Sequence, residues 1–109
     1  MSASPEFVEY VRDLLSPLGE LTDGDFFGGF AFKHGTRQFS MIMGNTLYFC
    51  VNEKTRPKYE SLKMSPFSYS TKKGLVKVRK YYSVPEELFE DRERFIAWAN
   101  EAIDSARSY

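Results

Sequence analysis

The residues most able to do chemistry form a cluster of cations in the second half of the chain. Positions 54–80 contain nine lysines and arginines against one acid, Glu60, which gives this segment a formal charge of +8. Phosphate groups and acidic proteins are the usual ligands of such a surface. The residues that can share one surface lie on one face of a predicted strand and in the turn before it: Lys77, Arg79, Tyr81, Lys72 and Lys73.

Two interpretations of this basic segment stay open. The net charge of the whole chain is zero, because the segments before and after positions 54–80 each carry seven acids and three bases. The cations can therefore be a solvated outer face that acidic helices balance, and we favour this over direct nucleic-acid binding. If the segments occupy different faces, the molecule is an electric dipole. Its basic side could then attract an acidic protein, a nucleic acid or the acidic side of a second copy.

No catalytic or metal-binding motif is recognisable in the sequence. The only histidine, His34, falls in a predicted hairpin turn, and the only cysteine, Cys50, lies in a predicted strand as a small buried hydrophobe. The glycines of 24–30 lack the spacing of a phosphate-binding or dinucleotide-binding loop. We therefore predict no catalytic residues, no metal and no cofactor. An unrecognised small-molecule enzyme, the last alternative, would require a pocket with convergent polar groups.

The apolar pattern predicts one α+β domain over residues 1–109. A helix begins at Pro5 with Ser4 as its cap, a short helical segment falls within 52–64, and further helices follow Ser83 and Asp91. The predicted strands are Phe26–Lys33, Gln38–Met43, Leu47–Val51, Phe67–Thr71 and Val76–Tyr82. Hairpin turns join most of them, so we expect a two-layer fold. It has one antiparallel sheet of about five strands, with the N-terminal and C-terminal helices packed on one face.

The helices can cover only one face of this sheet, and both faces should carry aromatic rings. Within the first strand, Gly28 and Gly29 indicate a bulge or a close backbone approach, and Phe27 beside them belongs to a candidate partner-binding region. In the last strand we expect the side that bears Val76 and Val78 to face the core. An uncovered aromatic face favours a dimer or partner interface, although tyrosine on an exposed strand is also simply a good strand former.

The compartment is predicted from what the sequence lacks. No apolar run approaches the roughly 20 residues that span a bilayer, and the first residues do not read as a signal peptide. A single cysteine agrees with a reducing environment. We expect a cytoplasmic protein without a membrane partner.

Landmarks along nearly the whole chain carry a family resemblance. They are Phe7–Tyr10, Leu14–Glu20, Phe27–Phe30, Thr46–Tyr48, Pro66–Tyr69 and Tyr81–Glu87, followed by Trp98, Ala99 and Ala102 in the closing helix. In this order they resemble the TfoX/Sxy N-terminal domain family. The resemblance implies an α+β domain that helps to regulate natural competence and DNA transformation together with a transcription factor. It implies no catalytic residues, and it agrees with a non-enzymatic regulatory module that binds a protein partner.

Overall fold

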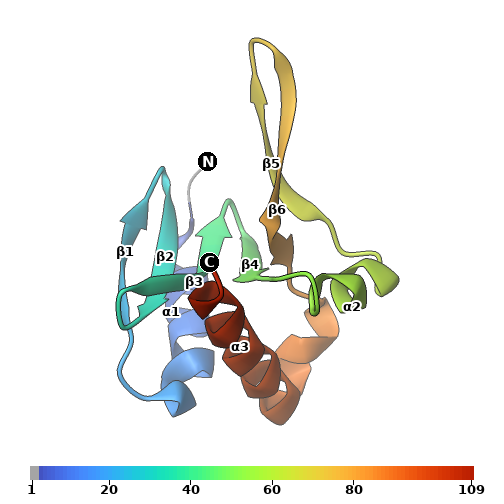
Figure 1. Cartoon of the computed structure of the whole chain (residues 1–109). Coiled ribbons are helices and arrows are strands. Elements are labelled where there is room, and N and C mark those ends of the chain that lie inside the picture. Colours follow the sequence, from blue (N-terminus) through green and yellow to red (C-terminus); the bar gives the residue numbers. More distant parts are fainter. Residues whose placement is uncertain (1–2) are drawn as a thin grey trace.

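The computed structural model describes residues 3–109 as helices on one side of an open sheet (Figure 1). The helices are α1 (Pro5–Leu15), α2 (Arg56–Ser61) and α3 (Arg92–Arg107), with short 3-10 helices η1 (Ser16–Leu18) and η2 (Glu86–Glu90). The strands are β1 (Thr22–Phe26), β2 (Gly29–His34), β3 (Arg37–Met43), β4 (Thr46–Cys50), β5 (Pro66–Thr71) and β6 (Gly74–Ser83). The six strands form one antiparallel sheet in the order β1-β2-β3-β4-β6-β5, which confirms the predicted fold class.

Side-chain caps define where the two long helices begin. The Ser4 hydroxyl oxygen accepts a hydrogen bond from the amide of Phe7 at 3.1 Å, and Pro5 occupies the first turn of α1. A carboxylate oxygen of Asp91 accepts from the amide of Arg94 at 3.2 Å at the start of α3. Both caps satisfy amides that have no partner inside the helix, so both predicted starts are confirmed.

The main core lies between the helices and one face of the sheet. The ring of Phe49 of β4 packs at a tilt against that of Phe95 of α3 with centroids 5.6 Å apart, and both side chains are fully buried. Tyr59 of α2 meets Trp98 of α3 edge-on at 4.9 Å. Burial of large rings on this side supplies most of the apolar area that stabilises the domain.

The first strand is one that the sequence pattern did not predict. β1 consists of Thr-Asp-Gly-Asp-Phe, whose three central residues are of types depleted in strands, yet it pairs with β2 along its full length. The predicted strand from Phe26 is therefore broken by a tight turn at Phe27 and Gly28, whose φ angles are +46° and +81°. The sheet has six strands because this turn creates an additional hairpin.

Gly29 confirms the close backbone approach that was expected near the paired glycines. A Cβ atom placed on Gly29 would lie 2.2 Å from the carbonyl oxygen of Ile42 and 2.7 Å from the sulfur of Met43. Neither the backbone of β3 nor the packed thioether leaves room for a methyl group. This position requires glycine for steric reasons.

The β5–β6 hairpin projects from the body of the domain (Figure 1). Only Tyr81–Ser83 of β6 pairs with β4, while Gly74–Val78 pairs with β5 alone. The β5–β6 register jumps from Pro66 opposite Tyr82 to Phe67 opposite Val78, which leaves three β6 residues in a bulge. The distal part of the hairpin is thus a two-stranded ribbon without a third strand.

This bulge overturns the predicted facing of the last strand. Val76 and Val78 were expected to face the core, but Val78 lines the open face of the sheet, away from the helices. Past the bulge, Tyr82 turns to the helical side, where its ring lies 6.2 Å from that of Tyr59. Tyr81 turns to the open face instead. Strict alternation fails because the bulged residues add an extra reversal.

Across residues 3–109, no helix is long and apolar enough to cross a membrane.

Candidate functional site

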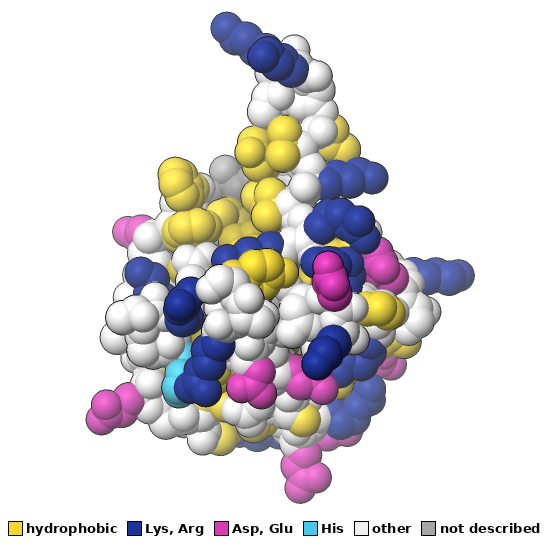
Figure 2. Space-filling view, in the orientation of Figure 1, with side chains coloured by type: hydrophobic (Ala, Val, Ile, Leu, Met, Phe, Trp, Pro, Cys, Tyr) yellow, Lys and Arg dark blue, Asp and Glu magenta, His cyan; other side chains and the backbone are white. Residues whose placement is uncertain are grey.

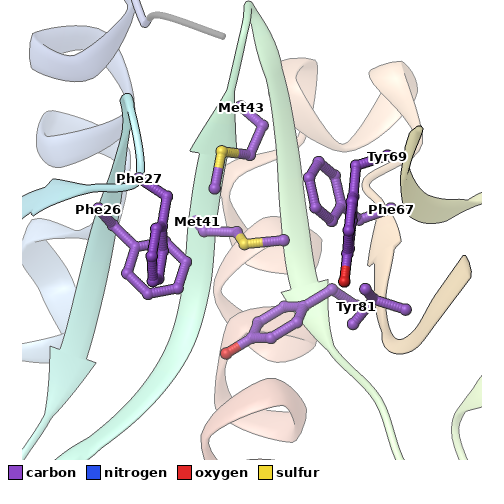
Figure 3. Close-up of a pocket in the computed structure, with 8 residues that line it drawn as sticks. Phe26, Phe27, Met41, Met43, Phe67, Tyr69 and Tyr81 are labelled. Atoms are coloured by element: carbon purple, nitrogen blue, oxygen red, sulfur yellow. The ribbon is translucent and has the colours of Figure 1, made fainter. Parts of the chain in front are cut away.

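An apolar groove occupies the open face of the sheet, on the side opposite α1 and α3 (Figure 3). Its volume is about 530 Å³, within the range of ligand and peptide pockets. The side chains that line it are Phe26, Phe27, Met41, Met43, Phe67, Tyr69, Val78 and Tyr81. Six of the eight are phenylalanine, tyrosine or valine and the other two are methionines, so the groove offers almost only apolar surface.

Three parts of the fold build the groove (Figure 3). Met41 and Met43 of β3 form its floor, because alternation along β3 sends them to the open face while Ile42 between them enters the main core. The β1–β2 turn supplies one wall, and the projecting hairpin supplies the facing wall. Methionine side chains are flexible and polarisable, so such a floor can adapt to different apolar partners.

Phe27 is the most exposed large hydrophobic side chain of the groove. Its ring is 86% exposed and meets the ring of Phe26 edge-on at 4.8 Å. The backbone of Phe27 has a φ of +46°, a left-handed conformation that costs a non-glycine residue about 1–2 kcal/mol. Asparagine or glycine is the usual choice at such a turn position. Phe27 therefore combines an unfavourable backbone conformation with an exposed apolar ring.

The Tyr81 hydroxyl and the neighbouring Cys50 thiol are both held in their protonated forms at neutral pH. The Tyr81 hydroxyl donates to the carbonyl oxygen of Gln38 at 3.3 Å, and burial raises the pKa of Tyr81 to about 12. Cys50, which pairs with Tyr81 across β4 and β6, is buried as predicted, and its burial raises the pKa of the thiol to about 11. Burial therefore disfavours the thiolate, which is the nucleophilic form of a cysteine.

The hairpin separates the basic residues from the groove. On its paired part, Phe67 and Tyr69 stand opposite Val78 and Val76, and this apolar strip continues the groove wall towards the tip. Lys77 lies between the two valines and so points to the other face of the ribbon. The hairpin is therefore amphipathic, with one apolar face and one polar, basic face.

The four cations that the sequence analysis grouped with Tyr81 lie at two places on the hairpin, and the Tyr81 side chain lies at neither of them. Arg79 pairs with Glu60 of α2 at 3.3 Å, which places it on the helical side with Lys77. Lys72 and Lys73 form the tip of the hairpin. Figure 2 shows dark blue side chains at this tip and along one flank of the hairpin, while yellow side chains fill the space between the hairpin and the β1–β2 turn. The single surface predicted for Tyr81 with these cations is not formed.

The two edges of the sheet carry opposite charge. At one edge, β1 and the segment before it carry Glu20, Asp23 and Asp25, of which Asp23 pairs with Arg12 at 3.0 Å. At the other edge, the β5–β6 hairpin carries only basic charged residues. The charged residues on these two edges are therefore of opposite sign, with Arg12 balancing Asp23 at the acidic edge.

The geometry contains no arrangement typical of a metal site. Within residues 3–109, no group of three or more histidine, cysteine, aspartate or glutamate side chains lies close enough to hold a metal ion. The three sequence-predicted residues around the first turn do meet at the groove: Phe27 lines it, Gly28 makes the turn, and Gly29 lies against the backbone of β3. Sequence reasoning missed Met41, Met43, Phe67 and Tyr69. Only their two-residue spacing hinted at a shared face.

Comparison with known proteins places these features in a family. Individual curated proteins show no significant match to the chain. The family model of the TfoX N-terminal domain matches residues 13–106, which is most of the 109-residue chain and includes every element from the end of α1 to α3. TfoX N-terminal domains are not a known enzyme family. The chain therefore belongs to the TfoX N-terminal domain family.

Proposed function

We propose that this domain is a non-enzymatic regulatory module that binds a protein partner through the groove on its open sheet face. The observation that carries the proposal is the groove itself, whose walls expose the rings of Phe27 and Tyr69 above a floor of buried methionines. Exposed apolar patches of this kind mark interaction sites in soluble proteins. An enzyme pocket would instead need several convergent polar groups. The hydroxyl of Tyr81 is a polar group of the lining, and it already donates a hydrogen bond to the carbonyl oxygen of Gln38.

The groove and its surroundings define the chemistry of the partner segment. Side chains that fit between the Phe27 wall and the Tyr69 wall are aromatic or aliphatic, because the lining offers few polar groups. The hairpin tip, with Lys72 and Lys73, favours acidic residues next to those apolar ones. We propose an apolar protein segment with acidic flanks. Its association should weaken at high salt, because the charges are exposed to solvent.

Family membership supports a regulatory role for this binding. The resemblance to TfoX/Sxy proteins implies participation in the control of natural competence and DNA transformation together with a transcription factor. A transcription factor with an apolar, acid-flanked segment is the partner that joins this implication to the groove.

Selection from a displayed library of random peptides tests the proposal. The wild-type domain should enrich peptides with aromatic or aliphatic residues next to acids. Tyr69→Asp should lose these peptides, because it puts a charge into the groove wall. Tyr10→Asp is the matched control, since Tyr10 on α1 is 47% exposed and Tyr69 is 46% exposed. Failure to enrich any sequence class, or equal binding by Tyr69→Asp, would contradict the proposal.

A second candidate function is direct nucleic-acid binding through the other face of the hairpin. The specific observation is that Lys77 and Arg79 share one flank of a projecting two-stranded ribbon whose tip carries Lys72 and Lys73. The major groove of DNA admits such a ribbon. Glu60 neutralises Arg79 on this flank, which weakens the case. A gel-shift titration should then show affinity that falls steeply as salt rises, and no shift at low salt would end the idea.

A further inference from the structure

We propose that the β5–β6 hairpin binds duplex DNA with the ribbon lying in the DNA major groove. The contact is made by the side of the ribbon turned away from the apolar groove, which we call the outer face. Its residues are Ser68, Ser70, Leu75, Lys77 and Arg79. The inference rests on the second candidate function and deepens it, because it names the form of nucleic acid and the contacts. It does not depend on the apolar groove, which lies on the opposite face.

The strand register brings hydroxyl groups and a cation together on the outer face. Ser68 stands opposite Lys77 in the β5–β6 pairing, and both therefore share one side of the ribbon. Ser70 stands opposite Leu75 on the same side, while Val76 between Leu75 and Lys77 points to the other. Hydroxyl and ammonium groups bind phosphates and base edges, and an aliphatic side chain can contact the methyl group of thymine. The outer face thus carries the kinds of side chain that contact a duplex.

Cations stand at both ends of this face. Lys72 and Lys73 form the tip of the hairpin, and Figure 2 shows dark blue side chains there and along the flank. At the base, Nε of Arg56 on α2 donates to the carbonyl oxygen of Arg79 at 3.2 Å, which holds α2 beside the ribbon. A strand rises about 3.3 Å per residue, so Lys73 and Arg79 lie roughly 20 Å apart along β6. The major groove is about 12 Å wide, so a ribbon of this length can reach phosphates on both of its sides.

Glu60 weakens this surface but leaves it basic. Its carboxylate oxygen pairs with one guanidinium nitrogen of Arg79 at 3.3 Å and accepts from the hydroxyl of Tyr82 at 2.8 Å. A guanidinium has five N–H donors and the Arg79 side chain is 62% exposed, so this pair uses only part of its hydrogen-bonding capacity. The local formal charge, with Glu60 included, is +4 from the five cations Arg56, Lys72, Lys73, Lys77 and Arg79.

The chemistry of the outer face favours duplex DNA over other anionic partners. Proteins that bind single strands stack the bases on aromatic rings, but Phe67 and Tyr69 of this hairpin line the apolar groove. The major groove of duplex RNA is too deep and narrow for side chains to read. Protein partners usually need an apolar centre in the interface, whereas Leu75 alone is apolar among the five residues of the outer face.

Fluorescence anisotropy with a labelled DNA duplex of random sequence tests the surface. Wild type should bind at low salt, and with about four phosphate contacts its affinity should fall on the order of a hundredfold as salt rises from about 50 to 200 mM. Lys77→Glu should weaken binding at least about tenfold, because it reverses the charge at the centre of the face. Lys33→Glu is the control, since Lys33 is an exposed lysine on β2, which three other strands separate from β5 in the sheet.

Tyr69 and Ser70 offer a matched pair of exposed neighbours on opposite faces of β5. Ser70→Glu should weaken DNA binding at least about tenfold and leave peptide binding in the apolar groove unchanged. Tyr69→Asp should lose the peptides and keep the DNA. Both changes add one negative charge to the same strand, so a general effect of charge would act on both alike. Equal losses of DNA binding in the two variants would overturn the assignment to the outer face.

Competition experiments test the form of the ligand. Unlabelled duplex DNA should displace the labelled duplex at lower concentration than single-stranded DNA or duplex RNA does. Equal displacement by either of these would overturn the major-groove arrangement. Polyglutamate stands in for an acidic protein, and displacement by it as effective as by duplex DNA would overturn the inference in favour of an acidic protein partner.

The outcomes also separate this inference from the two candidate functions. No binding at low salt would overturn the inference together with the second candidate function, while peptide selection that depends on Tyr69 would still support the first. If salt-sensitive DNA binding is reduced no more by Lys77→Glu and Ser70→Glu than by Lys33→Glu, the outer face is not the site. The inference would then be wrong, although nucleic-acid binding itself would stand.

Discussion

The two faces of this sheet are both apolar, but only one of them is covered. On the helical face, Phe49 and Phe95 are fully buried against each other. On the open face, Met41 and Met43 lie at the bottom of a groove whose walls remain exposed. Apolar character alone therefore does not distinguish a structural surface from a binding surface. What distinguishes them is whether the chain supplies its own cover.

The largest expected effect is on the covered face. Phe95→Ala removes a fully buried ring that packs on Phe49, so the free energy of unfolding should fall by about 3–5 kcal/mol. Chemical denaturation monitored by circular dichroism measures this loss. Tyr69→Ala, on the open face, is the matched comparison and should cost much less. Equal losses at the two sites would break the distinction between the faces.

Gly29→Ala should give the next largest effect, through backbone strain under the groove. The new methyl group would collide with the Ile42 carbonyl oxygen, so β2 must move away from β3 at an expected cost of about 1–3 kcal/mol or more. Thermal unfolding measures the change. Gly24→Ala in β1 has open space around its added methyl group and serves as the control. A Gly29→Ala protein as stable as Gly24→Ala would refute the close approach.

Alkaline pH should weaken the domain through the buried thiol of Cys50 in β4. The folded chain holds the Cys50 proton up to a pKa of about 11, whereas the unfolded chain loses it near 9.0. The stability is therefore complete below pH 9 and falls between these values, by about 3 kcal/mol at most from this group. Denaturation at a series of pH values should show a shallower fall in Cys50→Ala. Identical pH profiles would contradict the burial of this thiol.

The smallest effect is expected on the basic flank of the hairpin. Lys77→Glu should change the free energy of unfolding by no more than about 0.5 kcal/mol, because the side chain is exposed and lies away from the groove. It should equally leave the binding of the selected peptides unchanged. Lys54→Glu, another exposed lysine of the basic segment, is the control for the general effect of charge. A loss of peptide binding specific to Lys77→Glu would move the interface to the other face of the ribbon.

The covered face was more predictable from the sequence than the open face. The caps at Ser4 and Asp91 and the periodic apolar residues behind them are local signals, so α1 and α3 were predicted near their observed starts. β1 was missed because its polar residues lack strand propensity, and only pairing with β2 makes it a strand. The bulge before Tyr82 could not be predicted, since it depends on the register of two strands.

The groove could not be predicted from the sequence and was identified only in the folded structure. Its lining comes from the first turn, β3 and the late hairpin, which lie far apart in the sequence. The sequence predicted an aromatic uncovered face, and it singled out Phe27 with its two glycines. It placed Tyr81 with Lys77 and Arg79, however, because alternation without a bulge puts the three on one side. Charge clustering was readable from composition, but its separation from the apolar face was not.

The most direct test of the central claim is a map of amide chemical shifts by nuclear magnetic resonance as a selected peptide is added. The open face is predicted to be the docking surface, so the amides whose shifts change should cluster around Phe27, Met43, Tyr69 and Val76. The shifts of the amides of α1 and α3 should not change. Changes that concentrate on the helices, or a spectrum that no selected peptide alters, would contradict the account.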